Sequence, residues 1–92
     1  MKAIDWIERV KQHTGLSSDY AVAAALGFSR SALSKYRTDR TPTLDEDSAI
    51  KVANALGERP EAVLLDQYAE RTKAPEVRAA LLDAARRLCI LC

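Results

Sequence analysis

The most constraining stretch of this sequence is YAVAAALGFSRSALSKYR, residues 20–37, in which a glycine separates two short helical patterns. The first pattern is rich in alanine, and small side chains at a contact allow two helices to approach closely. Gly27 follows the apolar Leu26, and glycine readily adopts the left-handed backbone that turns a chain sharply. This spacing predicts a helix over 18–26, a tight turn, and a second helix over 30–38 that crosses the first.

The second of these helices has an apolar side and a polar edge. Its apolar positions are Ala32, Leu33 and Tyr36, and its polar positions are Arg30, Ser31, Ser34, Lys35 and Thr38. We therefore expect this helix to be packed along one side and exposed to solvent along the other.

Helical patterns also account for most of the remaining sequence. Apolar residues recur at three- and four-residue spacing over 3–14, 44–56, 60–71 and 75–91, and no segment alternates with the period of a strand. Thr43 and Glu46 have the spacing of a capping box, which predicts that the helix over 44–56 begins directly after Thr43. The expected fold class is all-α.

Charge is distributed unevenly along the chain. The net charge is +1, but residues 1–40 hold seven Lys or Arg against four Asp or Glu. A basic region on an otherwise balanced protein suits contact with a polyanion, although most charged runs are only solvated helix faces. No segment has the roughly 18–20 apolar residues of a membrane span, and Asp5 and Glu8 argue against a signal peptide. We expect a cytoplasmic protein without a membrane partner.

The sequence contains little that predicts catalysis or metal binding. The lone histidine, His13, has no acid or nucleophile at the spacing of a catalytic triad, so we expect no enzyme and no cofactor. Cys89 and Cys92 have the C-x-x-C spacing of metal ligands, but a tetrahedral zinc site needs four ligands. We expect no metal and interpret both cysteines as small apolar side chains.

The segment SDYAVAAALGFSRSALSKYR resembles the helix-turn-helix of phage Cro- and C1-repressor-like regulators, the XRE-type family. The match includes the small Ala23, the turn residue Gly27, and the apolar Leu26, Phe28 and Leu33. DEDSAIKVANALGERPEAVLL is similar to the fourth and fifth helices of that family. The resemblance implies a five-helix repressor-like domain over 1–71 that binds double-stranded operator DNA, as in small phage or prophage regulators with an added C-terminal helix.

The resemblance also assigns roles to individual residues. The positions that reach base edges correspond to Arg30, Ser31, Ser34 and Lys35. The positions near phosphates correspond to Ser18, Ser29, Arg37, Thr38, Arg40 and Thr41. Asp19 departs from the family pattern, because a neutral residue often stands there, and this puts a phosphate contact at Asp19 in doubt. Tyr36 stands at a common core position, and we expect it to pack with its hydroxyl near the backbone.

The C-terminal segment 72–92 is expected to form an amphipathic helix. Its apolar stripe consists of Val77, Leu81, Ala84, Leu88 and Leu91, at heptad-like spacings of four and three. We predict homodimerisation through this stripe, and two-fold symmetry would let the pair read an inverted repeat. The alternative is that the helix folds back and completes the core of its own chain.

The function predicted from these features is that of a sequence-specific transcriptional regulator, a phage-type repressor that binds its operator as a homodimer in the bacterial cytoplasm and nucleoid. One alternative is a protein-interaction module, antitoxin-like or a host-takeover protein, that uses the apolar C-terminal helix. Another is a nucleic-acid binder without sequence preference, for which a denser set of cations than Arg30 and Lys35 would be expected.

Overall fold

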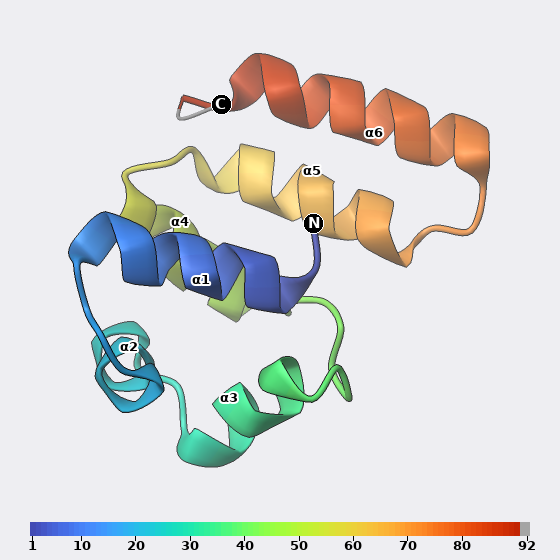
Figure 1. Cartoon of the computed structure of the whole chain (residues 1–92). Coiled ribbons are helices and arrows are strands. Elements are labelled where there is room, and N and C mark those ends of the chain that lie inside the picture. The colour runs from blue at the N-terminus through green and yellow to red at the C-terminus, as the bar shows by residue number, and fades with distance from the viewer. Residues whose placement is uncertain (91–92) are drawn as a thin grey trace.

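The computed structural model describes residues 1–90, which form six α-helices joined by short connections (Figure 1). The helices are α1 (Ala3–Thr14), α2 (Asp19–Leu26), α3 (Arg30–Arg37), α4 (Glu46–Leu56), α5 (Pro60–Arg71) and α6 (Pro75–Leu88). The described part of the chain contains no strand, so the predicted all-α class is confirmed. Helix α3 lies at one end of the molecule and α6 at the other, with α1, α4 and α5 between them.

The turn between α2 and α3 is built as its sequence predicts. Gly27 has a φ of 72°, and its N–H and that of Phe28 donate to carbonyl oxygens in the last turn of α2. This left-handed residue satisfies the carbonyls at the helix end and reverses the chain direction. Ser29 then begins α3, and its hydroxyl oxygen accepts a hydrogen bond from the N–H of Ala32 at 3.0 Å.

One apolar core joins the first five helices. Its side chains come from α1 through α5 and from the connection before α4; the largest fully buried ones are Ile7, Val10, Val22, Leu44, Val52, Leu56 and Val63. Leu33 and Tyr36 bring α3 into this core, and the Tyr36 ring lies 5.8 Å from that of Phe28. Tyr36 therefore packs as expected, but its hydroxyl donates to the Ser48 side chain at 3.4 Å and not to the backbone.

Helix α4 begins later than the sequence predicts. Its first residue is Glu46, and its N-cap is Asp45, whose carboxylate accepts a hydrogen bond from the N–H of Ser48 at 2.9 Å. Leu44 is fully buried in the connection, where its N–H donates to the side chain of Gln67 at 2.7 Å. The predicted capping box at Thr43 is therefore wrong, because burial and this bond hold Leu44 outside the helix.

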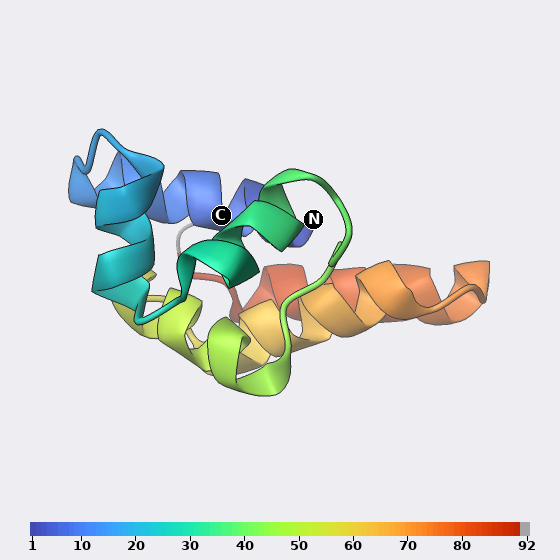
Figure 2. The same ribbon diagram turned by 90° about the horizontal axis from the view of Figure 1, so that it is seen from below.

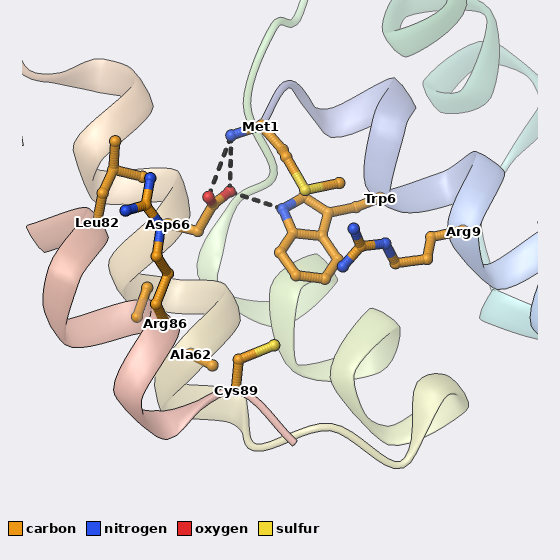
Figure 3. Close-up of a pocket in the computed structure, with 9 residues that line it drawn as sticks. Met1, Trp6, Arg9, Ala62, Asp66, Leu82, Arg86 and Cys89 are labelled. Carbon is orange, nitrogen blue, oxygen red and sulfur yellow. Dashed lines mark hydrogen bonds and ion pairs between the residues drawn. The ribbon is translucent and has the colours of Figure 1, made fainter. Parts of the chain in front are cut away.

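Two adjacent side chains of α5 form a buried polar centre, part of which Figure 3 shows. Asp66 accepts hydrogen bonds from the Trp6 indole at 2.7 Å and from the Met1 ammonium at 3.0 and 3.1 Å. Gln67 accepts from Leu44 and donates to the Met1 carbonyl at 2.7 Å. Because no buried side-chain polar atom of the described residues lacks a partner, this centre is fully satisfied.

Helix α6 lies along α5 in both views of the molecule (Figures 1 and 2). Arg78 donates to the carbonyls of Ala69 and Thr72 at the end of α5, at 3.2 and 3.0 Å. At the other end of α6, the N–H of Ile90 donates to the Glu58 carboxylate at 2.6 Å. A cavity of about 230 Å³ lies between α6, α5 and α1 (Figure 3). Among residues 1–90, no helix is long and apolar enough to cross a membrane.

We predict that Asp45→Ala lowers the free energy of unfolding by about 1 kcal/mol, since removing an N-cap side chain costs about 0.5–2 kcal/mol. Hydrogen bonds from Ser48 to Asp45 hold the pKa of that carboxyl below its usual value, so the cap is charged at neutral pH. Urea denaturation at pH 7 measures the loss. Asp47→Ala is the matched control, because its carboxylate lies in the same turn without capping; an equal loss in both variants would contradict the assignment of the cap.

Candidate nucleic-acid interface

The outer edge of α3 presents the four residues expected to reach bases. Leu33 and Tyr36 are buried on the inner side of the helix, which fixes the opposite side toward solvent. All four expected base-contacting residues are exposed: Arg30, Ser31, Ser34 and Lys35. Helix α3 lies at the bottom of Figure 1 and therefore faces the viewer in Figure 2, which is seen from below. The edge is therefore accessible along the length of the helix.

Ser18 and Ser29 are helix caps as well as exposed surface residues. The Ser18 hydroxyl oxygen accepts from the N–H of Ala21 at 3.1 Å, and that of Ser29 accepts from Ala32. A serine hydroxyl has a donor besides its acceptor lone pairs, so each remains able to donate to a phosphate oxygen. The caps also hold these hydroxyls at the positive ends of α2 and α3, where anions are favoured.

Arg37 is engaged within the protein. Its Nη2 lies 2.6 Å from the Glu8 carboxylate of α1 and 2.6 Å from the Asp19 carboxylate of α2. This guanidinium thereby connects α3 to both preceding helices. A phosphate contact by Arg37 would have to compete with two carboxylates, which sets it apart from the other expected phosphate-contacting residues.

Asp19, the residue that departs from the family pattern, is the second half of this connection. Besides Arg37, its carboxylate accepts from the Lys11 ammonium at 3.3 Å. Partial burial tends to raise the pKa of Asp19, but the hydrogen bonds from Arg37 and Lys11 outweigh it and hold that pKa below its usual value. The charge of Asp19 is thus balanced by cations of its own chain, which lessens its repulsion of a nearby phosphate.

The segment after α3 carries three further expected phosphate-contacting residues. The Thr38 hydroxyl donates to the Ser34 carbonyl at 2.9 Å, and the N–H groups of Arg40 and Thr41 donate to the carbonyl of Lys35 at 2.9 and 3.2 Å. Thr38 and Arg40 are exposed, whereas Thr41 is half-buried. In the described part of the chain, neither Arg40 nor Lys35 has an ion-pair partner, so both cations are available to an external anion.

An exposed tyrosine, which is not among the residues expected to contact DNA, lies beside this edge. Tyr20 on α2 is 63% exposed, and the guanidinium carbon of Arg30 lies 4.8 Å from the centre of its ring. Both residues line a groove of about 330 Å³ between α2 and α3. The sequence does contain a signal for this residue. Tyr20 is a large aromatic side chain directly after Asp19, and the apolar spacing of α2 places it outside the core.

The expected dimerisation residues lie on α6 with unequal exposure. Val77 is 44% exposed, whereas Leu81, Ala84 and Leu88 are half-buried beside α5. Leu91 lies outside the described residues. Leu82, Ala85 and Cys89 line the cavity toward α1, and each follows a stripe residue by one position, about 100° around a helix. The stripe therefore occupies a different flank of α6 from the cavity.

Cys89 differs from its expected state as a small buried thiol. Cys89 is half-buried and disulfide-bonded. Cys92 lies outside the described residues. Among residues 1–90, no three His, Cys, Asp or Glu side chains gather where they could hold a metal ion.

No protein-family model, curated protein or solved structure matches this chain.

We predict that Arg37→Ala lowers the free energy of unfolding by about 1 kcal/mol at neutral pH, because exposed ion pairs contribute about 0.2–1 kcal/mol each and this change removes two. The loss should shrink in acid: the folded pKa of Asp19 lies below its usual 3.8, so its contribution is present above that value and disappears as the pH falls through the folded pKa. Urea denaturation at several pH values measures both effects.

Arg40→Ala is the control for this prediction, because Arg40 is an exposed arginine of the same region with no ion pair among the described residues. Its stability should stay within about 0.5 kcal/mol of the parent protein. Equal stability of the two variants would show that Arg37 does not hold α1, α2 and α3 together.

Proposed function

We propose that this protein is a sequence-specific transcriptional regulator of phage-repressor type, which binds double-stranded operator DNA through α3 as a homodimer. The observation that carries the proposal is the division of α3 into a buried side, Leu33 and Tyr36, and an exposed edge of hydrogen-bonding side chains. A helix that reads DNA needs both, because one side must fix its orientation while the other enters the major groove.

The chemistry of the exposed edge suits base recognition. Arg30 and Lys35 can donate to guanine O6 and N7, and a serine hydroxyl can pair with several base edges. Ser31 and Ser34 are short, so the groove floor can approach the helix between the two longer cations. This mixture of cations and hydroxyls favours reading of bases over purely electrostatic attachment, which needs only positive charge.

Groups around this edge can hold the DNA backbone. The proposed phosphate contacts are Ser18, Ser29, Thr38, Arg40 and Thr41. Among the described residues, no carboxylate engages Arg40. Such contacts orient the protein on the duplex without reading sequence. Arg37 is a weaker candidate for this role, because Glu8 and Asp19 already engage its guanidinium.

The proposed dimer uses the apolar stripe of α6, of which Val77, Leu81, Ala84 and Leu88 are described. The stripe and α3 are at opposite ends of the molecule (Figure 1), so pairing of two copies would not cover the DNA-binding edge. The packing of α6 along α5 already covers part of the stripe, which leaves Val77 as the most exposed of its four described members.

The alternative function, a protein-interaction module, is favoured by the apolar surface at the same end. Tyr68 on α5 is 57% exposed and Ile90 is 58% exposed, in addition to Val77. A heterologous protein that bound there would make α6 its docking element. DNA selection separates the two functions, because only the regulator should enrich a sequence.

We predict that selection from random double-stranded DNA enriches a short inverted repeat, and that Arg30→Ala relaxes the preference at one position of each half-site. The loss of a bidentate contact to guanine should cost about 1–3 kcal/mol of discrimination. Sequencing of the retained DNA measures the preference at each position. Arg40→Ala should instead weaken binding to all DNA sequences alike and make the affinity depend less steeply on salt concentration.

Arg86→Ala is the matched control, because Arg86 is an exposed arginine on α6, far from α3. Its enriched sequence and affinity should equal those of the parent. Failure of the folded parent protein to enrich any sequence at low salt would overturn the proposal and direct attention to α6.

We predict that Val77→Glu converts a dimer into a monomer with the fold intact, because a partly exposed side chain tolerates a charge in the free chain but not in an apolar interface. Sedimentation at micromolar concentration measures the mass. Ala79→Glu is the control, since Ala79 is exposed and lies about 160° around α6 from Val77. A monomeric parent protein at that concentration would contradict the proposed dimer.

A further inference from the structure

Tyr20 and Arg30 form a pair on the exposed side of the groove between α2 and α3. The guanidinium carbon lies 4.8 Å from the ring centre, and a cation at this distance over a tyrosine face is attracted by the negative charge of that face. Tyr20 remains 63% exposed, so this contact is not a consequence of core packing.

The backbone that carries the Tyr20 ring is held in place at two points. Tyr20 lies in the first turn of α2, which the Ser18 cap holds, and its neighbour Asp19 is bound by Arg37 and Lys11. Arg30, by contrast, has no ion-pair partner among the described residues. The Tyr20 ring is therefore the partner that the described residues offer to the Arg30 head group.

Stacking uses the flat face of a guanidinium and leaves its N–H groups at the edge. Those N–H groups are the donors that a bidentate contact with guanine O6 and N7 requires. A long arginine side chain that is already ordered also loses less rotamer freedom when it binds. A ring that holds Arg30 in this way therefore favours guanine recognition without occupying the donors.

We propose that Tyr20 is a positioning residue for sequence recognition, which holds the Arg30 guanidinium ready for a guanine of the operator half-site. This inference rests on the proposed function. It assigns to α2 a part in specificity beyond its phosphate contacts, and it attributes that part to the aromatic ring and not to the hydroxyl.

Three variants test the role of the ring. Tyr20→Leu removes the aromatic face and keeps apolar bulk, Tyr20→Phe keeps the face and removes the hydroxyl, and Tyr68→Leu alters a similarly exposed tyrosine on α5. The measurement is the ratio of affinities for guanine and adenine at the position where Arg30→Ala relaxes the selected sequence. Tyr20→Leu should lower this ratio about two- to fivefold, which is the size of an exposed cation–π contact, while the other two variants preserve it.

The same ratio in the Arg30→Ala background shows whether Tyr20 acts through Arg30. Tyr20→Leu should have no further effect there, because the guanidinium that it positions is absent. An equal effect in both backgrounds would mean that the ring contacts DNA independently, and would overturn the inference. So would an unchanged ratio in Tyr20→Leu with Arg30 present.

Nuclear magnetic resonance of the DNA-free protein separates this inference from the proposed function. The Tyr20 ring should shift the side-chain resonances of Arg30. Tyr20→Leu should abolish this shift, whereas Tyr20→Phe should keep it. Arg9, which lies 5.1 Å over the Trp6 ring, is an internal reference that should not change. Undisplaced Arg30 resonances in the parent protein would overturn the pairing even if DNA binding is selective.

The remaining outcome is that the Tyr20 ring shifts the Arg30 resonances but the protein selects no DNA sequence. The pairing would then exist, but the proposed function would have failed, and the recognition role of Tyr20 would be overturned with it.

Discussion

The arrangement of this protein depends on Asp66 and Gln67, two adjacent polar side chains buried on α5. Through them, α5 binds the indole of Trp6 on α1 and the backbone of Leu44 before α4. A buried polar group without a partner is costly, so an alternative packing of α1 or of this connection would leave a carboxylate or an amide unsatisfied. Apolar contacts alone tolerate small shifts, whereas these bonds specify one position for each element.

The fixed positions of α1, α5 and the connection before α4 matter for α3. That helix has only eight residues and cannot be stable alone. Its position is set by the left-handed turn at Gly27, by the contact of Tyr36 with Phe28, and by the ion pairs of Arg37. Each of these acts on a different side or end of the helix. Arg30 and Lys35, on the exposed edge, take part in none of these three contacts. The edge can therefore vary in sequence without loss of the fold.

The parts of the structure that the sequence predicted are those encoded by near neighbours. Apolar spacing and the glycine at 27 located α2 and α3 to within a residue or two, because helix periodicity and turn chemistry are local. The start of α4 was misplaced because Leu44 is held by Gln67, 23 residues away. The partners of Asp19 could not be inferred for the same reason: Arg37 is 18 residues distant, and only the crossing of α2 and α3 brings the two together. The apolar pattern of α6 was compatible both with dimerisation and with packing onto its own chain. In the structure, α6 packs along α5.

Acidic residues near α3 bear on the proposed binding of DNA, because an unpaired carboxylate would repel a phosphate. Asp19 is bound by Arg37 and Lys11, and Asp39 lies 2.7 Å from the Lys2 ammonium. Each acid is thus paired with a cation of the same chain, while Arg30, Lys35 and Arg40 have no carboxylate partner among the described residues. The charge that a phosphate would meet on this side is therefore that of the three unpaired cations. Internal pairing of the acids also explains how a chain with a net charge of only +1 can present a basic edge.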